Sequence, residues 1–482
     1  MSVPPFDPVT AVLAIPLGAA AILALLPGYR LASRINVAAA ALTFLAALAL
    51  LEARPTPGRF FFVDDLNIVF VVLSTFVGFT TSMFSAGYIA HELDTGRLTP
   101  VYLRFYHAMY QILMFAMNLA LLANVIGLMW VAVELATLTT VLMVGVYRTH
   151  EALEAAWKYF ILGSVGIALA LFGTILVYMT AQPVVGQGLD AMMWTVLMRQ
   201  AAGFDATLLN LAFVFLFLGY GTKVGLVPLH AWLPDAHAEG PTPISAVLSG
   251  LLLNVALYAI LRFKMLLAAN AEAIAPGPLM MTLGLVSLVF AAFMLYRRRD
   301  IKRFFAYSSI EHMGIIVFAF GVGGPLANFA GLLHMTMHSL TKSAIFFVVG
   351  HITRIKGTQK ITEITGLTES HPMLGWLLIA GVAAIAGLPP SGIFVSEFLL
   401  VSSTFYQQKL LALVLVFGLL VALGALVMRL AGFAFGKPVG GMEPSRMSYA
   451  PIFLHLGFVF VAGIYQPAAF VAWLRHVAVL LG

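Results

Sequence analysis

The sequence predicts an all-α polytopic membrane protein with about 14 transmembrane helices. Hydrophobic residues make up 61% of the 482 positions, charged residues only 10%, and the mean hydropathy is +1.00. A soluble protein of this size is about 25% charged. Apolar runs of about 18 residues or more recur along the chain, which is the length that a helix needs to cross a bilayer. A transmembrane β-barrel would instead alternate apolar and polar residues, so these runs exclude it.

The expected spans form a single membrane domain over residues 1–482, because no connection is long enough to hold a soluble domain. No positive charge precedes the first span, which is therefore predicted to be a membrane helix and not a signal peptide. The last span contains Gln466-Pro467, where we expect it to break. The expected limits are 8–27, 31–51, 66–90, 106–123, 125–146, 155–180, 206–229, 244–267, 277–296, 304–321, 327–350, 373–402, 410–434 and 450–480.

The distribution of lysine and arginine predicts that both termini lie outside. With the N-terminus outside, seventeen of the 26 basic residues fall in inner connections and seven on the outer side, and Lys223 and Lys342 fall inside spans. Inner connections carry the excess of positive charge in membrane proteins. This bias explains the net charge of +6 without a nucleic-acid partner. The basic run 297–303 is then a topology signal with lipid head groups as its only partner.

Two spans are interrupted in matching places. Span seven contains Lys223 and then Pro228, and span twelve contains Gly387-Leu-Pro-Pro-Ser-Gly392. Such breaks free backbone carbonyls, which are tolerated at membrane depth only beside protein or a hydrated cavity. The breaks lie five spans apart, and an odd offset inverts the second copy relative to the first. Paired breaks are typical of inverted-repeat transporters. Spans 4–8 (residues 106–267) and 9–13 (residues 277–434) are therefore predicted to be two inverted five-helix repeats with broken helices 7 and 12.

Charged side chains inside the spans indicate an ion path, because a charge in hydrocarbon costs several kcal/mol unless it is paired or hydrated. Glu134 lies in the middle of span five, and Lys223 lies beside the first break. Each is the natural partner of the other, and both can exchange protons when they are desolvated. A fixed structural ion pair is the alternative.

Further titratable residues follow in spans ten and eleven. His334, His338 and Lys342 recur every four residues, so they share one helix face and resemble a proton wire. Packed core histidines and a metal site are the alternatives, and the lack of a cysteine or of a carboxylate on this helix disfavours the metal. His312 is a further relay candidate, and adjacent Glu311 is expected to face a neighbouring helix or subunit. The alternative is that the two form a satisfied hydrogen-bonding pair near the inner interface.

Polar residues at the two breaks complete the candidate path. Glu397 follows the second break and is placed to pass a proton from Lys342 to the outside or to a next subunit, with a fixed ion pair as the alternative. His230, Asp235 and His237 lie at the inner end of span seven. They form either a hydrated access to the path or a solvated loop.

The chain shows no motif of redox chemistry or catalysis. It contains no cysteine, which excludes disulfides and an iron–sulfur cluster ligated by this chain. A nucleotide-binding loop, a nucleophilic triad and a haem attachment motif are also missing from the sequence. We therefore expect no catalytic residue, no cofactor and no metal on this chain, and its enzyme class stays open.

Three segments resemble the antiporter-like subunits of respiratory complex I and their relatives in membrane-bound hydrogenases and multisubunit sodium/proton antiporters. They are Lys223 to Gly250, Phe305 to Gly314, and His338 to Lys342, within a resemblance over roughly residues 60–435. The resemblance implies that a glutamate, a lysine and a further charged residue in helices five, seven and twelve form the proton path. These roles fall on Glu134, Lys223 and Glu397, with family relays at His312, His334 and His338.

One position departs from the common family pattern. Where relatives have a lysine or histidine in helix eight, this sequence has Asn254, which cannot titrate. Together with Glu311, Asn254 resembles component F of hydrogenase-4 and formate hydrogenlyase. The central relay would then run through water, through His312 or through the row that begins at His334.

The resemblance implies a proton-translocating subunit of a membrane-bound redox complex, of the hydrogenase-4 type of group 4 nickel–iron hydrogenases. Its expected partners are other membrane subunits, a peripheral redox arm, the lipid bilayer and protons, with Na⁺ as the alternative ion. Its expected location is the inner membrane of a prokaryote. The alternatives are a subunit of a redox-free cation/proton antiporter or inorganic-carbon pump, and a membrane scaffold with a non-functional proton path.

Overall fold

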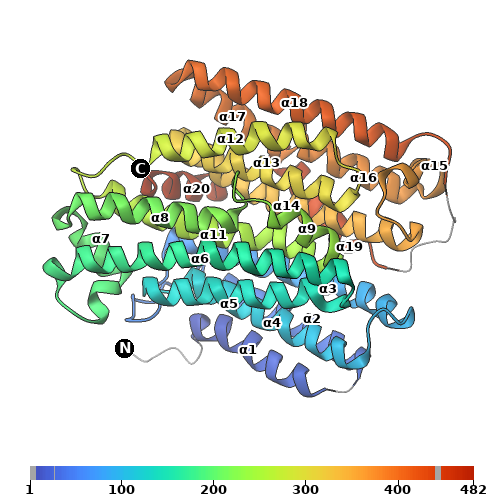
Figure 1. The fold of residues 1–482 in the computed structure, drawn as a ribbon, viewed down its shortest axis with the longest axis horizontal. Helices are drawn as coiled ribbons and strands as arrows, with labels where there is room; N and C mark the ends of the chain where they lie inside the picture. The colour runs from blue at the N-terminus through green and yellow to red at the C-terminus, as the bar shows by residue number, and fades with distance from the viewer. Residues whose placement is uncertain (1–6, 27, 440–446) are drawn as a thin grey trace. The chain divides into compact units, whose positions relative to one another are not determined.

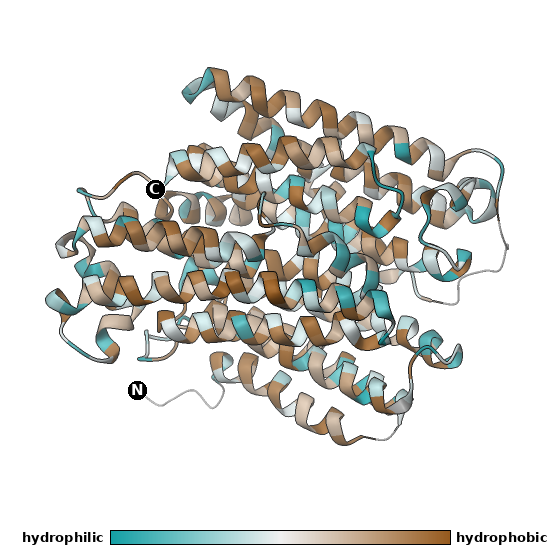
Figure 2. Cartoon of the chain, viewed as in Figure 1, coloured by the Kyte–Doolittle hydropathy of each residue, from teal (hydrophilic) through white to brown (hydrophobic). Residues whose placement is uncertain are grey.

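The computed structural model describes residues 7–26, 28–439 and 447–482. Over these ranges the chain is helical, and its β pairings are isolated bridges only. Twelve helices are long and apolar enough to cross a membrane, and a pair bent by 83° makes up to thirteen. Two shorter helices that meet at a break correspond to the span expected at 373–402. The predicted all-α polytopic membrane protein is confirmed, and hydrophobic residues dominate its helices (Figure 2).

The chain divides into two compact units. The first, unit 1, lies within residues 1–224 and 252–276. Side chains such as Asp64 and Thr149 accept hydrogen bonds from first-turn amides and fix where its helices begin. Its helices, labelled in Figure 1, are α1 (Pro8–Leu25), α2 (Tyr29–Ala49), α3 (Asp65–Asp94), α4 (Pro100–Leu122), α5 (Ile126–Val144), α6 (His150–Val185), α7 (Trp194–Gln200), α8 (Ala206–Val224) and α11 (Leu253–Ala268).

Unit 2 lies within residues 225–251 and 277–482. Its helices are α9 (Trp232–Glu239), α10 (Thr242–Val247), α12 (Gly277–Tyr296), α13 (Ile301–Val322), α14 (Gly324–Lys356), α15 (Leu367–Ser370), α16 (Pro372–Ile385), α17 (Gly392–Gln407), α18 (Lys409–Ala434), α19 (Ala450–Ile464) and α20 (Ala468–Leu480). Helices α12, α13 and α18 run side by side in this unit (Figure 1). The inverted-repeat relation between residues 106–267 and 277–434, and the outer location of the termini, stay predictions.

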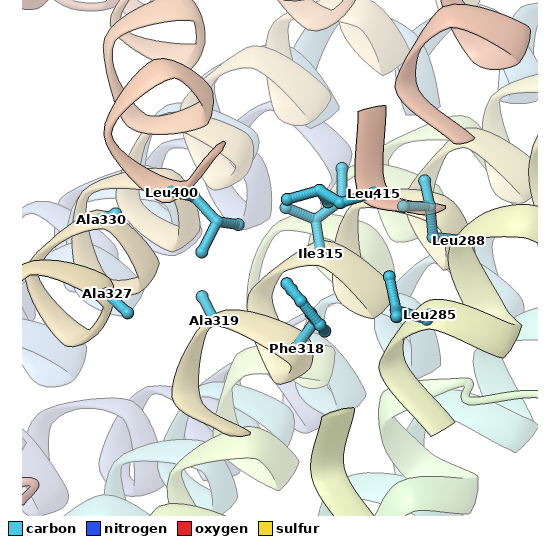
Figure 3. Packing of buried hydrophobic residues seen from close by; sticks show 9 residues of the cluster. All are labelled: Leu285, Leu288, Ile315, Phe318, Ala319, Ala327, Ala330, Leu400 and Leu415. Carbon is cyan, nitrogen blue, oxygen red and sulfur yellow. The ribbon is translucent and has the colours of Figure 1, made fainter. Parts of the chain in front are cut away.

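Close packing holds the helices of unit 2 together. A cluster of buried apolar side chains joins five of its helices, α12, α13, α14, α17 and α18 (Figure 3). Lipid is as apolar as these side chains, so their association rests on packing more than on removal from water. Gly284 of α12 permits this packing, because a Cβ there would lie 2.7 Å from the carbonyl oxygen of Gly314 in α13. The members of the cluster are Leu285, Leu288, Ile315, Phe318, Ala319, Ala327, Ala330, Leu400 and Leu415.

The first predicted helix break is present. Helix α8 ends at Val224, and Gly225 has a φ of +83°, which glycine adopts more easily than other residues. Pro228 follows and lacks a backbone donor. The amide of Val227 donates a hydrogen bond of 2.9 Å to the hydroxyl of Ser287, so a side chain satisfies a backbone group that the break frees.

The second predicted break is also present. Helix α16 ends at Ile385, Gly387 has a φ of +66°, and α17 begins at Gly392. Ser391 caps α17 by accepting a hydrogen bond from the amide of Phe394 at 3.2 Å. The last span breaks as predicted, because α19 ends and α20 begins on either side of Gln466-Pro467.

Candidate functional site

Lys223 is the penultimate residue of α8, and only 1% of its surface is exposed. Its Nζ lies 5.7 Å from the centroid of the Tyr159 ring in α6. It also lies against the backbone of α6, where a Cβ added to Gly163 would come within 2.7 Å of it. Among the described residues this ammonium has no hydrogen-bond acceptor. Nearby charges and water are therefore what can stabilise it at membrane depth.

Glu134 of α5 is half-buried and interacts electrostatically with Lys223. Over the described part of the chain the two groups form no ion pair within 4.0 Å. The expected partnership is thus one of neighbouring charges and not a hydrogen-bonded salt bridge, so a proton can leave either group without breaking a direct bond. Nearby, the hydroxyls of Thr140 and Tyr159 are 2.8 Å apart, a polar contact that the sequence analysis missed.

Asn254 is the second residue of α11 and is 1% exposed. It follows a π-helical turn at Leu248–Leu252, a feature that is common at functional sites. Because its side chain is buried, Asn254 does not face lipid. Its predicted place on a hydrated axis between Lys223 and His334 stays a prediction.

The histidines of unit 2 form a hydrogen-bonded chain between three helices. Nδ1 of His312 in α13 lies 2.9 Å from Nε2 of His334 in α14. Nδ1 of His334 lies 3.0 Å from the hydroxyl of Ser396 in α17. Each ring can accept on one nitrogen and donate on the other, and the direction depends on the tautomers. Ser396 was not predicted, although its place directly before Glu397 is a signal that could have identified it.

His338 and Lys342 continue this row along α14. The ring of His338 lies 5.4 Å from that of His312, and both of its nitrogens lack a hydrogen-bond partner among the described residues. Nζ of Lys342 donates to the carbonyl oxygen of Phe305 at 3.0 Å. Lys342 also interacts electrostatically with Glu311, which lies 3.6 Å from Nε2 of His312. The spacing of four residues therefore does bring the predicted row together with α13.

Glu311 and Glu397 both line a cavity of about 260 Å³ in unit 2, whose wall is otherwise mainly apolar and comes from α16, α17 and α18. The carboxylate of Glu397 packs against Gly387 at the helix break, where there is no side chain to obstruct it. Glu311 and Glu397 interact electrostatically. Nitrogens of His312 and His334 lie within 4.8 Å of a carboxylate oxygen of Glu397. The expected transfer of a proton from Lys342 to Glu397 stays a prediction.

Ligand atoms of His312, His334 and Glu397 lie within 4.8 Å of one another, so these residues could surround a cation. The facing nitrogens of the two histidines are, however, already within hydrogen-bond distance of each other. This arrangement favours a relay of hydrogen bonds, since a metal bound by both rings would have to replace the hydrogen bond between them.

The residues between α8 and α11 lead from the surface of unit 2 into its interior. Asp235 pairs with Arg303 at 3.1 Å, and this arginine is 41% exposed. His237 is fully buried, stacks on Phe346 with ring centroids 4.7 Å apart, and interacts electrostatically with Lys342. Asp235 thus lies at the exposed edge and His237 lies beside the α14 row. Whether these residues form a hydrated access or a solvated loop stays a prediction.

His230 has its ring 5.0 Å from that of Phe290 and 6.0 Å from that of Tyr307. Nζ of Lys302 donates to the carbonyl oxygens of Ala238 and Gly240 at 3.1 and 2.6 Å. The expectation that run 297–303 has lipid head groups as its only partner is thus wrong. Lys302 binds carbonyl oxygens at the end of α9, and Arg303 pairs with the carboxylates of Asp235 and Glu239.

Comparison with known proteins places this arrangement in a family. Residues 123–423 match the family described as NADH:quinone oxidoreductase/Mrp antiporter, TM. The chain is 62% identical over 460 residues to the hydrogenase-4 component F homolog of Methylacidiphilum infernorum (isolate V4), covering 95% of this chain and 97% of that protein. It is 33% identical over 243 residues to NADH-quinone oxidoreductase subunit M of Escherichia coli (strain K12), covering 50% of this chain and 48% of that protein.

Solved structures share the fold at lower identity. A chain of the archaeal membrane-bound sulfane sulfur reductase superposes with a TM-score of 0.88 at 21% identity, covering 98% of this chain and 97% of that one. A chain of respiratory complex I from Thermus thermophilus superposes with a TM-score of 0.81 at 22% identity, covering 99% and 100%. The family match over most of the membrane domain and the 62% identity along nearly the whole length show that this chain belongs to the NADH:quinone oxidoreductase/Mrp antiporter family of transmembrane subunits.

Proposed function

We propose that this chain is a proton-translocating, antiporter-like subunit of a membrane-bound redox complex of the hydrogenase-4 type, a group 4 nickel–iron hydrogenase. The observation that carries the proposal is the row of buried titratable groups on α13, α14 and α17. Its support is the 62% identity to a hydrogenase-4 component F homolog. Buried ionisable groups in a membrane protein are costly and mark proton relays by default.

In unit 1, Glu134 and Lys223 act as one coupled site. Each charge changes the proton affinity of the other, because the two interact electrostatically across a partly buried gap. Loss of a proton from Lys223 removes a charge that stabilises the Glu134 carboxylate, which then binds a proton more readily. The break after α8 keeps Lys223 at a helix end, where water can reach it.

In unit 2, a proton moves along the hydrogen bonds from His312 to His334 and then to Ser396. When His334 accepts a proton on one nitrogen it releases another from the opposite nitrogen, so the chain resets after the rings change tautomer. Glu397, with a carboxylate oxygen within 4.8 Å of nitrogens of His312 and His334, then receives the proton at the cavity that it shares with Glu311. The charge on either carboxylate changes the proton affinity of the other, which makes the cavity a coupled end point.

The energy for translocation comes from outside this chain. A peripheral redox arm would bind the substrate and clusters, and this subunit, without a cofactor of its own, would respond to charge changes in the neighbouring membrane subunits. The setting is the inner membrane of a prokaryote. A subunit of a redox-free antiporter or carbon pump is the second candidate, since the Mrp complex from Dietzia sp. DQ12-45-1b contains a chain of the same fold with a TM-score of 0.82.

The identity of the co-purifying subunits tests this assignment. The chain, tagged at a terminus, is purified from native membranes in mild detergent, and the associated proteins are identified by mass spectrometry. The expected result is a hydrogenase large subunit together with iron–sulfur subunits. Antiporter subunits or a carbonic-anhydrase-like protein in their place would contradict the hydrogenase assignment and favour the redox-free alternative.

A further inference from the structure

Helix α4 of unit 1 carries a buried stripe of polar side chains that the path above does not use. His107, Gln111 and Asn118 lie at intervals of four and seven residues and are each 0% exposed. On an α-helix these intervals keep all three within about 40° of one another. Asn36 of α2, also 0% exposed, meets the stripe where Nε2 of Gln111 donates to its Oδ1 at 2.9 Å. We call these four residues the α4 stripe.

The α4 stripe has far more hydrogen-bonding groups than protein partners. Both ring nitrogens of His107 and both amide atoms of Asn118 lack a partner among the described residues. The same holds for Oε1 of Gln111 and Nδ2 of Asn36. A buried polar group without a hydrogen bond costs roughly 1–3 kcal/mol in proteins, and in hydrocarbon no lipid group can supply one. Six such atoms in one row require another source of hydrogen bonds.

Polar groups continue from the α4 stripe toward the connection between α3 and α4. The ring of Tyr106 lies 5.4 Å from that of His107, and its hydroxyl lies 2.9 Å from that of Ser85 in α3. On α3, Tyr88 lies about one helical turn after Ser85, and Glu92 lies about two turns after it. The Glu92 carboxylate is 3.9 Å from Arg97, which is 64% exposed. Arg97 is thus the solvent-exposed end of this row of polar groups.

The opposite end of the α4 stripe is closed. Asn118 is followed by the last turn of α4, Leu119–Leu122, whose side chains are buried. From His107 to Asn118 the helix rises about 16 Å, roughly half the thickness of a bilayer core. An access route of this length reaches the middle of the membrane without joining its two sides.

We propose that the α4 stripe binds a file of water molecules and forms a proton access route, open at Arg97, that includes neither Glu134 nor Lys223. Buried waters typically make about three hydrogen bonds each to otherwise unsatisfied polar groups, and the α4 stripe supplies such groups in sequence. His107 can pass a proton between neighbouring waters, since it offers two ring nitrogens with no protein partner. The proposal that the α4 stripe is hydrated does not depend on the proposed function. The proposal that it conducts protons rests on the proposed function.

The absence of cysteine from this chain makes accessibility directly measurable. Gln111→Cys introduces a single thiol on the α4 stripe, and Leu113→Cys places one at a 0% exposed position on another face of α4 as the matched control. The intact complex in liposomes is treated with Ag⁺, which binds thiolates that water can reach. The chain is then unfolded, and free thiol is alkylated and counted by mass spectrometry.

In the Gln111→Cys variant, Ag⁺ is expected to protect most of the introduced thiol from alkylation. In the Leu113→Cys variant, the introduced thiol should be fully alkylated. Equal alkylation at the two positions would overturn the hydrated route. His107→Leu, compared with Leu113→Met as a packing control, is expected to lower proton uptake per turnover several-fold while the complex assembles. Normal uptake with His107→Leu would overturn the conducting role. The thiol labelling does not depend on proton pumping, so failure of the hydrated route is distinguishable from failure of the proposed function.

Discussion

Gly163→Ala is a small change that tests the placement of Lys223 directly. Gly163 lies in α6, where an added Cβ would be 2.7 Å from Nζ of Lys223 and 3.4 Å from Cγ2 of Thr137. The first distance is too short for any real contact, and the second is tight but tolerable. Since Nζ is the end of a flexible side chain, the ammonium moves and the helices stay in place.

The size of the effect follows from this geometry. Nζ must retreat from 2.7 Å to at least 3.4 Å, a displacement of about 0.7 Å. A misplacement on the order of 1 Å can slow a positioned chemical step about 100-fold, so we expect translocation to fall about tenfold. Helix stability does not suffer, because alanine is favoured over glycine in a helix interior by about 1 kcal/mol.

Proton uptake by vesicles, divided by substrate turnover in the same preparation, measures the change. Gly127→Ala serves as the control, because a Cβ there would make an ordinary contact 3.6 Å from Sδ of Met192 in the same unit. The control should translocate like the wild type. If Gly163→Ala also does so at a wild-type level of assembled complex, Lys223 does not act from the position described.

Three further predictions concern other residues. Glu397→Gln should strongly lower proton uptake per turnover, because glutamine keeps the size and polarity of the side chain that packs against Gly387 but cannot titrate; wild-type uptake would make Glu397 an anchor only. Asn254→Lys should be tolerated, because the neighbours of this buried position already accommodate a polar side chain, and loss of the complex from membranes would contradict this. Burial acts to raise the pKa of Asp64, but the charge and hydrogen bonds of Arg262 outweigh it and hold that pKa below its usual value. The stability from this pair is therefore present above the unfolded pKa of about 3.9 and is lost as pH falls through the native pKa. Asp64→Asn should lower the free energy of unfolding by about 2 kcal/mol at pH 7, which is less than for a fully buried pair because Asp64 is 32% exposed. The variant should also lose less stability than the wild type as the pH falls. An unchanged melting temperature would contradict this prediction.

The fold was largely predictable because its determinants are local. Apolar runs set the spans, and the breaks at Gly225 and Gly387 follow from glycine and proline chemistry within a few residues. The spacing of His334, His338 and Lys342 likewise fixed their common face before any contact was known.

What the sequence could not supply were contacts between helices. Ser396 meets His334 only because α17 packs against α14, and Glu397 shares a cavity with Glu311 from a helix far away in sequence. The α4 stripe is an intermediate case. The spacing of His107, Gln111 and Asn118 was visible in the sequence, but the missing partners became apparent only from the packing.

The central claim is that protons pass through the Lys223 site, and Lys223→Met tests it most directly. Methionine has a similar length and no charge, so it removes the titrating group from a buried position without leaving a large cavity. The complex is purified, reconstituted in proteoliposomes and assayed for proton uptake and substrate turnover together. Near-complete loss of proton uptake in an assembled complex is the predicted result. Normal proton uptake per turnover would show that Lys223 is structural and would contradict the proposed path.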